Sequence, residues 1–245
     1  MEAPGKTRKG EQTRERILDA ALDLFRTQGY AETTMRQIAD AAGVAVGNAY
    51  YYFASKDKLI LAFYERNHTD HIAVLGDALD HTREFQDRLR VVLRTKVESA
   101  MPYRRLATKL FTSAADPESP LSPFSPESAP LRDAAVRLMA EVIDGSGLRV
   151  GKDLRADLPE LLWLYEMGVI LYWVHDASDD CAKTFVLIER TVPLVERLVG
   201  LAKLPVVRPM VREVVGMLDY LRPTTEPAAA RAVGDGSRRG RARPS

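Results

Sequence analysis

Hydrophobic residues recur at intervals of three and four along most of the chain, which is the period of a helix with one apolar face. The first such stripe comprises Ile17, Leu18, Ala21, Leu24 and Phe25. Gly29 is expected to end this helix, because glycine adopts the left-handed C-cap conformation at little cost. No segment shows the sustained two-residue alternation of a half-buried strand. The pattern therefore predicts an all-α fold.

A second helix and a tight turn follow. Either Thr33 or Thr34 can cap this helix, and Gln37 stands three residues after Thr34, which is the spacing of a capping box. Gly43 then permits a sharp turn, after which a short third helix is expected over residues 46–52. Two helices joined in this way form a helix-turn-helix, in which the later helix enters the major groove of DNA.

Longer helices are predicted for the rest of the chain. The fourth begins at Lys56 behind the N-cap Ser55. Six more are expected over residues 85–100, 103–114, 131–144, 159–174, 181–202 and 209–221. The segment 116–130 holds five prolines and is expected to be a loop, since proline removes a helix donor and restricts the residue before it. This loop is interpreted as a connection, with a lid over a ligand pocket as the alternative.

The pattern divides the chain into four parts: a flexible arm (1–9), a helix-turn-helix domain (10–70), a larger helical domain (71–222) and a disordered tail (223–245). The arm places Lys6, Arg8 and Lys9 against Glu2 alone, which predicts contacts with phosphates or the minor groove. The tail holds five arginines, two acidic residues and no apolar periodicity. It either adds non-specific phosphate affinity or has no role.

Composition narrows the class of protein. The 245 residues carry a formal net charge of +1, so nucleic-acid binding needs a local site in place of a basic field over the whole chain. A single cysteine excludes an internal disulfide framework and a cysteine-only zinc site. The N-terminus lacks an apolar signal region, and the most apolar stretch, 161–174, is interrupted by Glu166 and too short for a membrane span. A cytoplasmic chain with no membrane partner is expected.

The most specific segment is TRERILDAALDLFRTQGYAETTMRQIADAAGVAVGNAYYYFASKDKLILAFYE, residues 13–65. It resembles the N-terminal domain of the tetracycline-repressor (TetR) family, in the motifs ILDAALDLF, TTMRQIADAAGV, GNAYYYF and SKDKL. The resemblance covers about a fifth of the chain; beyond it, only the helical character is similar. It implies a dimer whose C-terminal helices form a ligand pocket and a dimer interface, with the ligand releasing DNA.

Seven residues are expected to contact DNA: Thr34, Val46, Gly47, Asn48, Tyr51, Tyr52 and Lys56. At a helix start, the Thr34 hydroxyl and the first amides can meet a phosphate, and the same hydroxyl can act as the N-cap. The resemblance implies a phosphate contact for Lys56, against the alternative of a solvated surface lysine. Gly47 lets the backbone approach the groove, and the Asn48 amide can read adenine or meet a phosphate.

Three consecutive tyrosines point about 100° apart on a helix, so they cannot share one environment. The resemblance implies that Tyr50 leans toward the core of the small domain, while the hydroxyls of Tyr51 and Tyr52 reach phosphates or base edges. Packing in the core is the alternative for any one of them. Two residues depart from the family pattern: Ala45 stands where a capping serine is common, and Val46 where a lysine often enters the groove. The contact of Val46 is therefore expected to be apolar, as with a thymine methyl.

The helices over 159–174 and 181–202 present more apolar surface than one intramolecular face needs. A four-helix bundle formed by two chains would bury it, which predicts a homodimer. A mostly apolar cavity for a small apolar or amphipathic effector is hypothesised, lined by Phe111, Trp163, Met167 and Tyr172, with Trp173 a further possibility. The alternative for these side chains is ordinary core packing.

The sequence contains two groups of residues that could bind a metal or take part in catalysis, but structural roles fit both groups better. Glu65, His68, Asp70 and His71 suggest a metal site, but two histidines without an evident further ligand fit a solvated helix face better. The stretch from His175 to Cys181 is interpreted as a turn that caps the next helix, with a role in catalysis as the alternative. No metal, cofactor or catalytic residue is predicted.

The predicted function is a ligand-responsive repressor that binds a palindromic operator in double-stranded DNA as a dimer and is released by a small molecule. The alternative is a constitutive or activating DNA-binding regulator controlled by a protein partner. An all-helical enzyme is a third possibility, for which the sequence offers no phosphate loop or supported triad.

Overall fold

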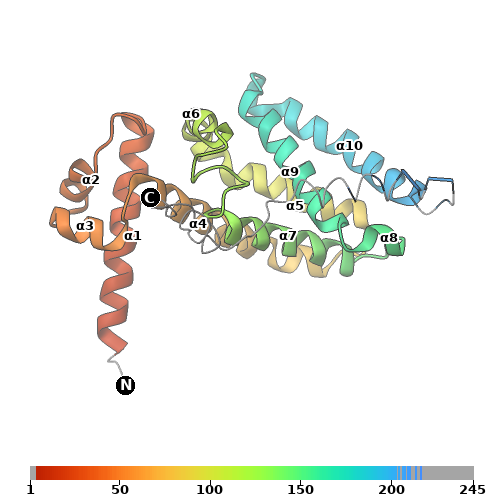
Figure 1. The fold of residues 1–245 in the computed structure, drawn as a ribbon, viewed down its shortest axis with the longest axis horizontal. Coiled ribbons are helices and arrows are strands. Elements are labelled where there is room, and N and C mark those ends of the chain that lie inside the picture. Colours follow the sequence, from red (N-terminus) through yellow and green to blue (C-terminus); the bar gives the residue numbers. More distant parts are fainter. Residues whose placement is uncertain are drawn as a thin grey trace, which may run out of the picture.

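In a computed structural model, residues 4–202, 204, 206–207, 209–210, 213 and 216 are described, and their regular secondary structure is entirely helical (Figure 1). The longer helices are α1 (Pro4–Thr27), α2 (Met35–Ala42), α3 (Val46–Tyr52), α4 (Lys56–Asp80), α5 (Phe85–Ala100), α6 (Arg104–Ala115), α7 (Ala129–Asp144), α9 (Leu158–His175) and α10 (Ala182–Leu201). Short helical turns form η1 (Met101–Tyr103), α8 (Lys152–Arg155) and η2 (Asp179–Cys181). The all-α prediction is confirmed, and the helix expected over 209–221 lies largely outside the described residues.

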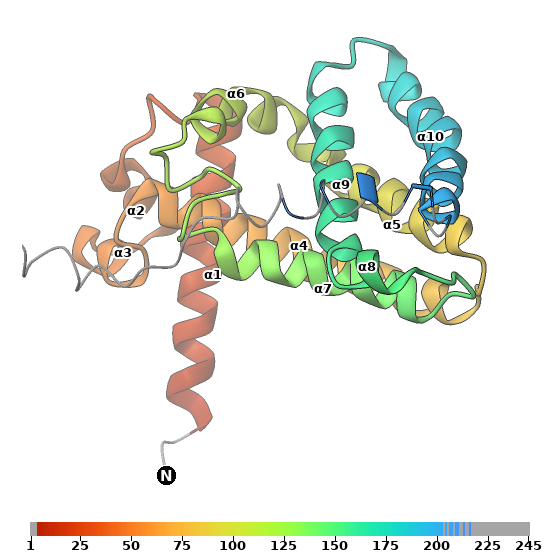
Figure 2. The ribbon, with the colours of Figure 1, turned by 45° about the vertical axis from the view of Figure 1, so that its right-hand side comes forward.

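The N-terminal segment differs from the expected flexible arm. Helix α1 begins at Pro4, so residues 4–9 continue the first helix. Proline is well tolerated at the first helical position, because the N–H that it lacks has no partner there. The hydroxyl of Thr13 also donates to the carbonyl oxygen of Lys9 at 2.9 Å, within the same helix. Figures 1 and 2 show the start of α1 projecting well beyond α2 and α3.

The small domain is built on one apolar cluster. Helices α1, α2 and α3 and the start of α4 bury the side chains of Ile17, Leu18, Phe25, Ile38, Ala49, Phe53 and Leu59. The same cluster also includes three side chains that come later in the sequence: Leu106 and Leu110 of α6 and Leu121 of the proline-rich segment. Helix α6 packs on both α1 and α9. The small domain is therefore joined to the larger one through side chains as well as through α4.

Helix α4 runs unbroken from the small domain into the larger one, so the expected boundary at residue 70 falls inside a helix. The second apolar cluster lies among α4, α5, α7, α9 and α10, where α9 and α10 run side by side (Figure 2). Among the described residues, no helix combines the length and the apolar character needed to cross a bilayer.

The turn between α9 and α10 is organised by Asp176, as a capping turn. One carboxylate oxygen accepts from the backbone N–H and the hydroxyl of Ser178, and the other from the same two groups of Thr184, at 2.6–2.9 Å. Burial acts to raise the pKa of Asp176, but these four hydrogen bonds outweigh it and hold that pKa well below its usual range. Asp180 and Cys181 both have left-handed backbone conformations in this turn.

Candidate nucleic-acid interface

Helix α3 is presented to solvent by the turn before it. Gly43 adopts a left-handed conformation, with φ of 63°, and its N–H donates to the carbonyl oxygens of Ala39 and Asp40. Ala49 is fully buried and anchors α3 on α1 and α2, while Gly47, Asn48 and Tyr51 on the other side are exposed. The chain thus folds a short helix with one small inward residue and a polar, open outer face, as a helix-turn-helix requires.

The start of α3 has no side-chain cap. Ala45 occupies the N-cap position, and its backbone carbonyl accepts from the N–H groups of Asn48 and Ala49 at 2.9 and 3.2 Å. The N–H groups of the first helical residues lack partners within a helix, and Gly47 is exposed with open space around it. The free N–H groups at the start of α3 can therefore donate to a phosphate oxygen.

The tyrosines do not follow the expected order. Tyr50 is 52% exposed, which contradicts its placement toward the core. Tyr52 instead packs against the small-domain cluster, because it stands three residues after buried Ala49 and so shares its side of α3. Tyr51 is 82% exposed, with its ring edge-on to that of Tyr52 at 5.2 Å between centroids. Tyr50 and Tyr51 are thus the tyrosines that are exposed enough to reach DNA, and Tyr52 packs against the ring of Tyr51.

Thr34 caps α2 as expected. Its hydroxyl oxygen accepts from the backbone N–H of Gln37 at 3.2 Å, and the Gln37 side-chain oxygen accepts from the backbone N–H of Thr34 at 2.8 Å. The hydroxyl also donates to that side-chain oxygen at 2.9 Å. Thr34 remains exposed, so the cap leaves it accessible to a phosphate.

Lys56 is not a solvated surface lysine. Its ammonium donates to the carbonyl oxygens of Tyr30 at 2.7 Å and Ala31 at 3.3 Å, and lies 4.6 Å from the centroid of the Tyr30 ring. The Tyr30 hydroxyl in turn donates to the carboxylate of Asp57. Lys56 therefore closes the loop after α1, and an ammonium has three donors, so one is left for a phosphate.

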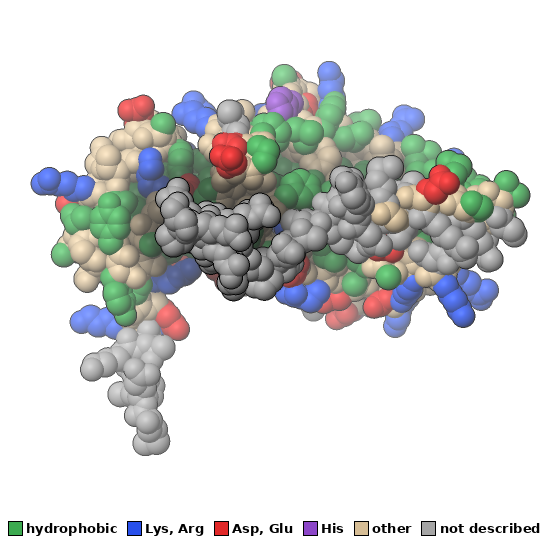
Figure 3. Space-filling model, in the orientation of Figure 1, with side chains coloured by type: hydrophobic (Ala, Val, Ile, Leu, Met, Phe, Trp, Pro, Cys, Tyr) green, Lys and Arg blue, Asp and Glu red, His purple; other side chains and the backbone are tan. Residues whose placement is uncertain are grey.

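Two further cations lie beside the expected contacts. Arg36 is exposed in the first turn of α2, two residues after Thr34, and Lys58 is exposed in the first turn of α4. Neither is among the contacts predicted from the sequence, although a cation in the first turn after a helix cap is a pattern that the sequence contains. Arg8 and Lys9 of α1 are exposed as well, and Figure 3 shows Lys and Arg side chains around this end of the molecule.

The four residues expected to line a ligand cavity are not brought together. Trp163 is buried, with its ring edge-on to that of Phe124, whereas Tyr172 is 40% exposed. The two stand nine residues apart on α9, which places them on opposite sides of that helix. Met167 is half-buried in the second cluster, and Phe111 of α6 packs edge-on against His175. In this structure the four residues do not line one cavity, and a ligand contact by any of them stays a prediction.

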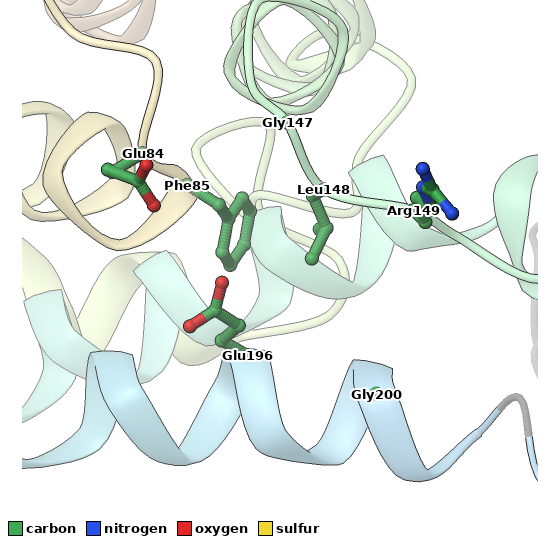
Figure 4. Close-up of a pocket in the computed structure, with 7 residues that line it drawn as sticks. All are labelled: Glu84, Phe85, Gly147, Leu148, Arg149, Glu196 and Gly200. Atoms are coloured by element: carbon green, nitrogen blue, oxygen red, sulfur yellow. The ribbon is translucent and has the colours of Figure 1, made fainter.

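A recess of about 380 Å³ lies elsewhere, between the start of α5, the segment after α7 and the end of α10 (Figure 4). Its lining residues are Glu84, Phe85, Gly147, Leu148, Arg149, Glu196 and Gly200. The four expected cavity residues contribute nothing to it.

The histidines of α4 also differ from expectation. His71 is fully buried, so it does not belong to a solvated face, and its Nε2 lies 3.1 Å from the carbonyl oxygen of Val92 and 2.9 Å from the hydroxyl oxygen of Thr95. Within the described part of the chain, no group of three or more His, Cys, Asp or Glu side chains is arranged to hold a metal ion.

These features define an all-helical protein with a helix-turn-helix at one end and a larger helical domain at the other. Residues 17–63 match the family model described as "Bacterial regulatory proteins, tetR family", and residues 88–217 match "Tetracyclin repressor-like, C-terminal domain". The second match alone spans more than half of the chain. The chain belongs to the TetR family, whose members are transcriptional regulators and not enzymes.

Curated relatives match a part of the chain. The chain is 44% identical over 54 residues to the regulator SrpR of Pseudomonas putida, covering 22% of this chain and 25% of that protein. It is 37% identical over 95 residues to the repressor KstR of Mycobacterium tuberculosis, covering 39% and 36%. The chain thus covers well under half the length of these relatives.

Solved structures extend the likeness to about three quarters of the chain. FadR of Thermus thermophilus, a TetR family transcriptional repressor in complex with lauroyl-CoA, has a TM-score of 0.54 and 27% identity, covering 73% of this chain and 92% of that one. The TetR transcriptional regulator of Nitrosomonas europaea has a TM-score of 0.58 and 15% identity, covering 74% and 96%.

Proposed function

We propose that this chain is a ligand-responsive repressor that binds a palindromic operator as a homodimer, inserts α3 into the major groove and is released by a small molecule. The observation that carries the proposal is the presentation of α3. Buried Ala49 fixes the helix on the small domain, and Gly47, Asn48 and Tyr51 stand outward from it. Hydroxyl and cationic groups that can bind phosphates lie around them, on Thr34, Arg36, Tyr50, Lys56 and Lys58. This activity belongs in the cytoplasm, where the operator is.

The homodimer is supported by an apolar surface on α9 and α10. Its exposed large side chains are Leu171, Tyr172, Val186, Leu194, Leu198 and Leu201. Exposed Gly168 lies among the outward residues of α9, and a Cβ there would have no described atom within 4 Å apart from the adjoining backbone of its own helix. A glycine inside a helix costs about 1 kcal/mol relative to alanine, and a second helix crossing closely at this point explains its presence. Two such pairs form a four-helix bundle that sets the two α3 helices at a fixed separation.

The ligand response is supported by the way that the two domains are joined. Helix α4 is shared, α6 packs on both α1 and α9, and Leu121 is buried in the small-domain cluster. A ligand that changes the packing around α4 or α6 therefore changes the position of α3. The relative FadR from Thermus thermophilus is a repressor solved with lauroyl-CoA, which supports an effector with a large apolar part.

Selection of bound DNA from a random pool by the full chain tests this function. We expect an inverted repeat whose half-sites lie about 34 Å, one helical turn or a multiple of it, apart. The matched variants are Asn48→Ala on α3 and Asn67→Ala on α4. The first is expected to lose the selected sequence and the second to retain it. Enrichment of no sequence, or of a single half-site by a monomer, would contradict the proposal.

A further inference from the structure

A buried imidazole in the larger domain has one nitrogen without a partner. His71 of α4 is 0% exposed, and its Nδ1 is buried with no hydrogen bond in the described part of the chain. The other ring nitrogen, Nε2, faces the carbonyl oxygen of Val92 and the hydroxyl oxygen of Thr95 on α5. A buried polar atom left unpaired is costly in free energy, so it points to a group that the protein binds.

The partners of Nε2 fix the chemistry of Nδ1. A carbonyl oxygen can only accept, so Nε2 carries the proton and donates to Val92. The Thr95 hydroxyl donates to the carbonyl oxygen of Val91 at 2.7 Å, which leaves its oxygen to accept from Nε2 as well. Burial, followed by the Lys96 ammonium, lowers the pKa of His71 to about 3, so the ring is neutral at pH 7. Nδ1 is therefore a hydrogen-bond acceptor that has no donor among the described residues.

Two ionisable side chains lie on the helices that enclose this interior. Glu166 of α9 is 3% exposed. Lys96 of α5, half-buried, is the common electrostatic neighbour of His71 and Glu166. Burial raises the pKa of Glu166, and the ammonium of Lys96 opposes that rise. The rest of this interior is apolar, with Leu75, Val92, Val97 and Val169 in the same cluster.

We propose that the larger domain binds a neutral, largely apolar effector that donates a hydrogen bond from a hydroxyl or N–H group to Nδ1 of His71. This rests on the proposed ligand-responsive function and names the chemical class of the ligand. A carboxylate anion has no proton to donate to Nδ1, and a cation would face the ammonium of Lys96. A neutral donor avoids both problems and enters this apolar interior without the cost of burying a charge.

The test compares pairs of probes that differ only in the donor: p-cresol with toluene, 2-naphthol with naphthalene, and 4-phenylphenol with biphenyl. Binding to the full chain is measured by calorimetry, and 2-naphthoate is the anionic comparison. We expect at least one phenol to bind about tenfold more tightly than its hydrocarbon, which corresponds to about 1.4 kcal/mol of binding free energy. In the naphthalene series, 2-naphthol is also expected to bind more tightly than 2-naphthoate. The ¹⁵N resonance of His71 Nδ1 is expected to move with that phenol and not with the hydrocarbon.

His71→Gln is the specific variant, since its amide nitrogen can still donate to Val92 while the Nδ1 acceptor is lost. His81→Gln, at the exposed C-cap of the same helix, is the matched control. The preference for the phenol should vanish in the first variant and persist in the second. If His71→Gln fails to fold, the ¹⁵N shift in the wild-type chain decides.

Equal binding within every pair, no binding by any probe, or an unmoved His71 resonance would overturn the assignment; the last two leave a buried water as the partner of Nδ1. The operator selection without any probe is scored separately. Specific DNA binding with no preference for phenols rejects the ligand class alone, whereas loss of specific DNA binding rejects the proposed function whatever the probes do.

Discussion

The guanidinium of Arg88 occupies the place that a side chain at Gly145 would take. Arg88 is buried in α5 and donates to the carbonyl oxygens of Thr82, Glu141 and Val142 at 3.0–3.1 Å, and also to that of Leu79. One side chain thereby donates to backbone carbonyls in the last turns of both α4 and α7, where helix ends leave carbonyls short of partners. The far end of the shared helix α4 is fixed by this contact.

Gly145→Ala should therefore destabilise the protein by about 1–3 kcal/mol, because the added methyl overlaps the guanidinium and forces it off the carbonyls. Gly147→Ala, two residues later, is the matched control, since a side chain there meets no atom within 4 Å. Urea unfolding of the two variants measures the difference. Equal stability of both variants would show that Arg88 can move aside without loss.

The Asp176 turn predicts a dependence of stability on pH. Because the folded-state pKa lies below the ordinary value for Asp, the stabilisation is present above about pH 4 and is lost as the pH falls through the folded pKa. Asp176→Asn should cost about 2 kcal/mol at pH 7, with the gap to wild type narrowing toward pH 3. Asp179→Asn, exposed in the same turn, serves as the control. A gap that is constant with pH would contradict the assignment.

The two lysines that open α4 should separate stability from DNA affinity. Lys56→Met removes the hydrogen bonds to Tyr30 and Ala31 and is expected to lower the free energy of unfolding by about 1–2 kcal/mol, as well as weakening DNA binding. Lys58→Met should leave stability unchanged and reduce the salt dependence of binding by about one phosphate contact. Chemical denaturation and a salt titration of DNA binding check the pair. The reverse outcome would exchange the two roles.

The proline-rich segment between α6 and α7 should matter for the stability of the small domain. Leu121→Ala opens a cavity in the small-domain cluster and is expected to cost about 2–4 kcal/mol, although the residue lies in a loop. Phe124→Ala, three residues on, loses only an edge contact with Trp163 from a half-exposed ring, about 1 kcal/mol. Thermal unfolding of both variants gives the comparison. Similar small losses would mean that the segment is a simple connection.

The proposed dimer predicts a specific sensitivity of α10. Leu198→Glu places a charge in the apolar surface of α9 and α10 and should convert the chain to a monomer with an intact fold. Val74→Glu, equally exposed on α4, should leave the oligomeric state unchanged. Sedimentation with circular dichroism distinguishes the outcomes. A dimer that survives Leu198→Glu would place the interface elsewhere.

Much of the fold could be predicted from local signals. The bounds of the helices over 46–52 and 85–100 agree with those of α3 and α5, and the capping box at Thr34 is present, because caps and glycine turns act over a few residues. For the tyrosines of α3, helical phase from Ala49 places Tyr52 inward and Tyr50 outward, whereas the resemblance implies the reverse. Helical phase likewise places Trp163 and Tyr172 on opposite faces of α9.

Other features depend on contacts between distant segments and leave no local pattern. The burial of His71 is decided by α5, and that of Leu121 by the small-domain cluster. The lysine at 56 could be assigned to a phosphate by resemblance, but its bond to Tyr30 requires the loop after α1 to fold back over it. Such contacts are set by tertiary packing, which periodicity along the chain does not record.

The central claim is that the outer face of α3 reads the bases of the operator. The most direct measurement is the ratio of the affinities for the selected operator and for bulk DNA, compared between wild type, Asn48→Ala and Lys58→Met. The account predicts that Asn48→Ala lowers this ratio by about tenfold or more, while Lys58→Met weakens both affinities alike and leaves the ratio unchanged. An unchanged ratio in Asn48→Ala, together with an unchanged ratio in Tyr51→Ala, would contradict the claim.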